Sequence, residues 1–247
     1  MKRICLPGIT FALVLAMALS MAPSMAQQPA LAQKDSSIDA EITALTERVE
    51  VLEGTRAIKK LQRAFGFYVD RGLWGEAADL FADNGSIEIG VDGVYVGKAR
   101  IREYLMRLHG GQEGLIYGQL NEWITLQPAI SITKDGNSGT ARWRDHAMLG
   151  QYKQHAEWRD GVYENTYVKE GGVWKLNALH LYVNFQVPYE RGWARLQPGE
   201  ALTQSETAKA FPPDRASTAQ YKPFPDVQVP PFQAVNPVTG KPVRGAR

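Results

Sequence analysis

The side chain best suited to acid–base chemistry in this 247-residue sequence is a histidine in the phrase "RWRDHAML". His146 stands in a run typical of a strand, and simple alternation places Arg142, Arg144 and Met148 on its face. An imidazole titrates near neutrality, so it can both take and return a proton. The sequence therefore favours His146 as a general base; the alternative is a surface histidine beside two solvated arginines.

Other polar and aromatic side chains are suited to holding a substrate. The phrase "GVYENTYVK" places Tyr163 and Asn165 on one strand face, where a phenol and an amide can position a hydroxyl or stabilise negative charge. Ordinary cross-strand packing of tyrosines is an equal alternative. His109 ends a predicted helix, where it most simply complements the helix C-terminus. The remaining candidates for substrate binding are Tyr95, Trp74, Arg144 and, on a largely apolar strand face, His180. Tyr68 is a further candidate for the catalytic set.

The chain lacks the motifs of several enzyme classes. It contains no Gly-rich phosphate loop, no G-x-S-x-G elbow and no H-E-x-x-H, and its four histidines are not at metal-ligand spacing. A hydrophobic content of 44% and a charged content of 22% are ordinary for a soluble globular protein. We therefore expect chemistry without a metal or a cofactor, performed on a small molecule.

The first 26 residues have the layout of a secretory signal peptide. Lys2 and Arg3 precede an apolar run from Ile9 to Ala22, and small residues follow, with cleavage expected after Ala26 and Ala32 as the alternative site. Cleavage removes Cys5 and brings 28 Lys+Arg down to 26, equal to the 26 Asp+Glu. A neutral, cysteine-free mature chain has no basic footprint for nucleic acid and no disulfide. We expect a periplasmic protein that is not held in the membrane.

The elements that must position these side chains follow in order. A linker and leading helix occupy 27–54, with apolar residues from Ile38 to Leu52 in coiled-coil spacing and a break at Gly54. This helix packs either on its own domain or on a neighbouring subunit. The main domain, 55–196, begins with helices around a hairpin at "SIEIGVDGVYVG" and ends in long strands, which together predict an α+β fold with helices on one face of a curved antiparallel sheet. The strands are expected at 119–133, 140–152, 155–169 and 173–186.

The last segment, 197–247, holds nine of the 14 prolines. Proline at this density favours extended segments. The segment is either disordered or docked along the domain or a partner subunit through aromatic residues such as Phe211 and Tyr221, since disorder usually depletes aromatics.

Three phrases resemble the SnoaL-like branch of the nuclear transport factor 2-like superfamily: "FYVDRGLWGEAADLFADNGSIEI", "GVYVGKARIREYL" and "GVYENTYVKEGGVWKL". The resemblance covers roughly Thr55 to Trp193 and implies a cone-shaped α+β barrel. Scytalone dehydratase has a helix-end aspartate that precedes a tryptophan much as Asp70 precedes Trp74. The resemblance thus implies that Asp70 is an acid or base at the cone mouth, where it would orient His146, and that Tyr163 faces the pocket.

The match to scytalone dehydratase is incomplete. That enzyme directs two histidines at its aspartate, whereas the phrase "GQLNEW" offers only Gln119 or Asn121 where the first is expected. A superfamily fold implies chemistry only weakly, because the cone hosts isomerases, dehydratases, cyclases and non-catalytic binders.

The sequence and the resemblance together favour a cofactor-free lyase acting on a hydrophobic, aromatic hydroxylated small molecule. The sharpest form is a dehydratase or a γ-formaldehyde lyase of lignin-derived diarylpropanes or phenylcoumarans, since such sphingomonad enzymes are similar in architecture. The alternatives are a non-catalytic periplasmic binding or assembly module and an isomerase of the ketosteroid-isomerase type. The superfamily implies a homodimer or homotrimer.

Overall fold

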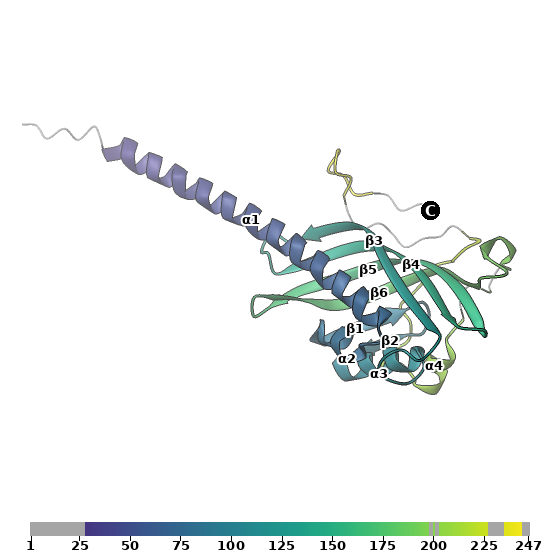
Figure 1. Cartoon of the computed structure of the whole chain (residues 1–247). Helices are drawn as coiled ribbons and strands as arrows, with labels where there is room; N and C mark the ends of the chain where they lie inside the picture. The colour runs from purple at the N-terminus through teal and green to yellow at the C-terminus, as the bar shows by residue number, and fades with distance from the viewer. Residues whose placement is uncertain (1–27, 198–199, 201–202, 227–234, 244–247) are drawn as a thin grey trace, which may run out of the picture. The chain divides into compact units, whose positions relative to one another are not determined.

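The computed structural model describes residues 28–197, 200, 203–226 and 235–243. The expected signal peptide, 1–26, lies outside the described residues. The chain divides into two compact units, Met1–Ala44 and Leu45–Arg247. The second unit contains the whole sheet (Figure 1). Among the described residues, no helix is both long enough and apolar enough to cross a membrane.

A six-stranded curved sheet forms the main domain, with the order β2-β1-β6-β5-β4-β3. Its strands are β1 (Phe81–Ile89), β2 (Val94–Val96), β3 (Gln119–Ile132), β4 (Ser138–Gln151), β5 (His155–Glu170) and β6 (Val173–Pro188). The predicted α+β class, the hairpin and the four long strands are confirmed. Two details differ: β1 and β6 pair in parallel, which makes the sheet mixed, and the sheet stays open at β2 and β3 rather than closing into a barrel.

The helices begin with α1, a single helix from Gln28 to Asp70. The predicted break at Gly54 is wrong, because the glycine lies inside the helix at a close contact: a Cβ there would be 2.6 Å from Cδ1 of Ile132. From this point α1 buries Ile58, Phe65 and Val69 in the core. The others are α2 (Trp74–Asp79), α3 (Lys98–Leu108), the short 3₁₀ helix η1 (Trp193–Arg195) and α4 (Glu206–Ala210).

The pleat of the sheet separates an inner face from an outer face. Along β4 the residues Ala141, Trp143, Asp145 and Ala147 are buried and alternate with more exposed neighbours. β5 continues the inner face with Arg159, Tyr163, Asn165 and Tyr167. Successive side chains on a strand point to opposite faces. The odd-numbered residues of these two strands therefore supply the core and the even-numbered ones the outer surface, except for Val162, which is also buried.

The described part of the proline-rich segment docks on the domain. The carboxylate of Glu88 on β1 accepts hydrogen bonds from Ser217 Oγ at 2.7 Å and from the backbone N–H of Thr218 at 2.7 Å. Tyr221 donates its hydroxyl to the backbone oxygen of Val183 at 2.9 Å. Of the two alternatives left open by the sequence, residues 203–226 thus follow the docked one.

Candidate active site

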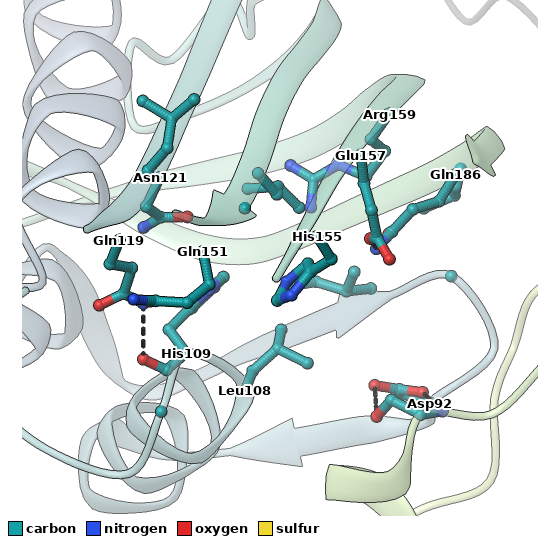
Figure 2. A pocket seen from close by; sticks show the side chains of 18 of the residues that line it. Asp92, Leu108, His109, Gln119, Asn121, Gln151, His155, Glu157, Arg159 and Gln186 are labelled. Carbon is teal, nitrogen blue, oxygen red and sulfur yellow. Dashed lines mark hydrogen bonds between the residues drawn. The ribbon is translucent and has the colours of Figure 1, made fainter. Parts of the chain in front are cut away.

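A cavity of about 640 Å³ opens at the end of the sheet where β4 and β6 end and β3 and β5 begin (Figure 2). The turn after β1, the end of α3, Ile116 and three residues of the C-terminal segment, Glu200, Thr203 and Ser205, also line it. Its polar lining includes Asp92, His109, Asn121, His155, Glu157 and Arg159. This volume is in the range of ordinary small-molecule sites.

His109 is the buried imidazole of this cavity. It caps the C-terminus of α3, and Gly110 follows with a positive φ of 105°, which turns the chain so that the ring is directed inward. The ring stacks on Trp74 at 5.0 Å between centroids and meets the edge of Trp123 at 5.3 Å. Within the described residues its Nε2 has no hydrogen-bond partner. Burial, together with the positive charge of Arg159, lowers the pKa of His109 to about 3, so the imidazole is neutral at physiological pH.

A buried ion pair forms the other side of the site. Arg159 donates from Nε to Oδ2 of Asp145 at 2.8 Å and from a terminal nitrogen to Oδ1 at 3.3 Å. The side chains of Arg159 and Asp145 are only 2% and 0% exposed. Gly161 and Ala147, which lie directly opposite this pair on the two strands, are small enough to leave room for it. The guanidinium also lies over the Trp123 ring, with its Cζ 4.0 Å from the centroid.

The ion pair leaves the guanidinium with unused donors. An arginine carries five N–H groups, and only the bonds to Asp145 involve Arg159 in the described part of the chain. Because Arg159 lines the cavity, these donors are available to an acceptor or anion on a bound molecule. The site thus combines a neutral imidazole and a fixed positive charge within one enclosed space.

His146 lies on the outer face of the sheet, because it follows Asp145 by one residue. Its ring contacts Trp158, 5.2 Å away, and it does not line the cavity. Arg144 is on the same outer face, where it pairs with Asp160 at 3.3 Å. The structure therefore does not bring His146 together with Asp70 or with the cavity.

Asp70 ends α1 beside the free edge of β3. Its Oδ1 accepts a hydrogen bond from the backbone N–H of Trp123 at 2.6 Å, and Asn121 donates to the carbonyl of Val69 at 2.7 Å. β3 is an edge strand, so this carboxylate satisfies a backbone donor that no further strand can pair. Asp70 is half-buried, does not line the cavity, and joins the helix to the sheet.

The ionisation of Asp70 gives a testable pH dependence. Burial raises its pKa from 3.8 to about 6 although the bond from Trp123 acts in the opposite direction. The folded state therefore binds this proton more tightly than the unfolded state. Protonation of Asp70 thus stabilises the folded state fully below pH 3.8, and this contribution is lost as the pH rises through 6. In Asp70→Asn the amide oxygen still accepts from Trp123. We expect the wild type to lose stability relative to this variant between pH 4 and pH 7, measured by urea unfolding; parallel curves would contradict this.

Trp74 and Tyr95, predicted to bind substrate, and Tyr68, predicted to be catalytic, make their contacts within the domain. Trp74 lies behind His109 and donates to the backbone oxygen of Gln112 at 2.7 Å. Tyr95 is buried and donates to the backbone oxygen of Phe211 at 2.8 Å, and Tyr68 packs against the core. None of these three side chains lines the cavity.

Tyr163 and Asn165 lie on the inner face, as expected, but deeper than the cavity. The Tyr163 hydroxyl has no hydrogen-bond partner among the described residues, and burial and the nearby Asp145 charge raise its pKa well above 10. Asn165 donates to Oε1 of Gln62 at 2.9 Å and so ties α1 to the sheet.

His180 is on the outer face of β6, beside the docked tail, that is, the described residues 203–226. Its Nδ1 is 3.7 Å from Oε2 of Glu88, and its ring stacks on Tyr182 at 3.8 Å between centroids. Burial lowers its pKa, and the negative charge of Glu88 opposes that effect. His180 belongs to the attachment of the tail rather than to the cavity.

The residues that the sequence did not single out for the site are Asp145 and Arg159, and His109 was assigned only a capping role. A signal for Asp145 was available. Ala141, Trp143 and Ala147 mark the apolar, inward set of β4, and Asp145 belongs to it by parity. An aspartate at a core position requires a partner.

Comparison with known proteins agrees with this fold. LinA matches with 15% sequence identity and a TM-score of 0.50, over 57% of this chain and 93% of that one. A LinA-type3 hexachlorocyclohexane dehydrochlorinase from Novosphingobium barchaimii is 16% identical, with a TM-score of 0.49 over 58% and 92%. A scytalone dehydratase-like protein of Novosphingobium aromaticivorans is 18% identical, with a TM-score of 0.49 over 56% and 89%.

At 15% identity the LinA match speaks for the fold alone, and the other two, with TM-scores below 0.5, are reported only as similarities. No curated protein sequence matches the chain. A family model, the SnoaL-like domain, matches residues 50–180, which is more than half of the chain and includes most of the sheet. This protein therefore belongs to the SnoaL-like domain family.

Proposed function

We propose that this protein is a cofactor-independent lyase that removes a small leaving group from a hydroxylated aromatic molecule bound in the cavity. The observation that carries the proposal is the pairing of His109, neutral and with a buried Nε2 that has no partner among the described residues, with the Arg159 guanidinium in one cavity. His109 and Arg159 both line the cavity, with Nε2 of His109 itself buried beneath the cavity surface. A base and a fixed positive charge at one site are the minimum for an elimination. A protein that only binds its ligand does not need them together.

The two groups have different roles. Nε2 of His109 takes a proton from the substrate, and Arg159 stabilises the negative charge that develops. The pKa of about 3 makes His109 a weak base in the empty cavity, in part because of the positive charge of Arg159. An oxyanion seated on that guanidinium offsets the charge and raises the pKa of the imidazole, so base strength increases when substrate is bound.

A phenolic substrate suits this arrangement. Loss of the proton from a para-phenol sends an electron pair through the ring and expels a benzylic hydroxyl, which takes up a proton and leaves as water. A second proton transfer then releases formaldehyde where the side chain carries a hydroxymethyl group. We further propose that the reaction takes place in the periplasm, which the predicted leader sequence supports.

Mass spectrometry of a turnover reaction tests the proposal. The purified protein is incubated with phenolic diaryl and polycyclic hydroxylated compounds without added cofactor. A product lighter by water, or by water and formaldehyde, would support the lyase. A product of unchanged mass would replace it with an isomerase, and tight binding without turnover would replace it with a binding module.

A further inference from the structure

Helix α1 carries an exposed row of large apolar side chains before it reaches the core. The row is Ile38 (44% exposed), Ile42 (56%), Leu45 (50%), Val49 (51%) and Leu52 (70%). The steps between them are four, three, four and three residues, so they lie on one face of the helix. Five large aliphatic side chains in one row are more than the single scattered apolar residues that are normal on a surface.

This row is not the face that α1 uses to pack on its own sheet. Ile58, Phe65 and Val69 are fully buried and define the core-facing side of the helix. Val49 and Ile58 are nine residues apart, which at about 100° per residue is a rotation of about 180°. Within residues 45–70 the exposed row therefore points away from the core, and the domain itself cannot cover it.

The spacing and residue types match a two-stranded coiled coil. Ile42 and Val49 occupy a positions of the heptad, and Leu45 and Leu52 occupy d positions, with Ile38 at the preceding d. β-branched residues at a combined with leucine at d favour parallel dimers. An in-register parallel pair stacks each of the five residues on its own equivalent.

The flanking charges agree with pairing to an identical helix. Arg48 is at a g position and Glu53 is at the following e position. In a parallel dimer a g residue lies next to the e residue five positions later in the other helix, so Arg48 of each chain meets Glu53 of the second copy. The same segment of a second chain is therefore complementary to the exposed row in both shape and charge.

We propose that residues 38–52 of α1 pair in parallel with the same residues of a second copy and make this protein a coiled-coil homodimer. The helix is already formed in α1, so association does not have to nucleate it. The inference does not depend on what the cavity does.

A matched pair of variants of the full chain tests the dimer by light scattering after size exclusion. Val49→Lys places a charge in the row, whereas Val51→Lys places the same charge at a c position outside it; the two valines are 51% and 40% exposed. We expect a dimer for the wild type and for Val51→Lys, and a halved mass, 27.4 kDa, for Val49→Lys. A monomeric wild type, or a mass that responds equally to both variants, would overturn the proposal.

Disulfide trapping tests the orientation. In a Cys5→Ser background, the Ile38→Cys and Leu52→Cys variants are each oxidised alone. A mixture of the two reduced variants is oxidised in parallel. A parallel helix pair brings each cysteine next to its own equivalent, so each variant forms covalent dimers alone, and Val51→Cys does not. Covalent dimers that form only between the 38 and 52 variants would show an antiparallel pair and overturn the parallel arrangement. Circular dichroism checks that every variant keeps its helix.

Discussion

Asp145→Asn is expected to lower the free energy of unfolding by about 3–5 kcal/mol, because it leaves the Arg159 guanidinium buried and without its counter-charge. Both side chains are almost completely buried, at 2% and 0% exposure, so water at the cavity edge cannot fully compensate for the lost carboxylate. Urea unfolding followed by tryptophan fluorescence measures the loss.

The adjacent residue provides the control for this experiment. Arg144 precedes Asp145 but lies on the outer face, where its ion pair with Asp160 is half exposed on the arginine side. Arg144→Ala should cost no more than about 1 kcal/mol, as is usual for surface pairs. A double variant, Asp145→Leu with Arg159→Met, should recover much of the loss since no buried charge then remains. Equal effects of Asp145→Asn and Arg144→Ala would show that the buried pair is not critical for stability.

His109→Gln is expected to reduce turnover of a substrate by about 10²- to 10⁴-fold, the usual contribution of a general base. His146→Gln should leave turnover unchanged, because that imidazole faces the opposite side of the sheet. The comparison is made by steady-state kinetics on variants whose thermal unfolding shows that they remain folded. Loss of turnover in His146→Gln with normal turnover in His109→Gln would reverse the assignment.

The pH profile provides an independent readout of the same base. A base must be deprotonated to act, and kcat/KM reports the pKa values of the free enzyme. Burial and Arg159 lower the pKa of His109 to about 3. We therefore expect kcat/KM to show no fall near pH 6.5, where an ordinary imidazole becomes protonated. A fall at that pH that persists in His109→Gln would indicate a different base.

The sequence was sufficient to predict the order of elements and the strands, because the long strands are bounded by clear turns. β3, β4 and β5 begin and end within two residues of their predicted limits. It was less informative about which face of a strand is inward. Strand parity has a period of two, so the adjacent residues Asp145 and His146 lie on opposite faces of β4, and the predicted base is on the outer face.

The helix interruption at Gly54 shows a second limit of the sequence. Glycine is unfavourable within a helix, and by propensity alone a break is the better expectation. The reason for the glycine is a contact with Ile132, which is 78 residues away in the chain. His109 is a similar case, since its stacking on Trp74 and Trp123 depends on three separate segments meeting. Such long-range contacts have no local sequence signal.

The folded structure around Glu88 is complete only after the docked tail has been synthesised. All the hydrogen bonds recorded for the Glu88 carboxylate, among the described residues, come from residues 217–219, about 130 positions later in the chain. The family match, in contrast, stops at residue 180. Before residues 217–219 have been synthesised, this buried carboxylate lacks its donors, and leaving it without them is costly. The nascent chain therefore cannot complete the surroundings of the Glu88 carboxylate until residues 217–219 have left the ribosome.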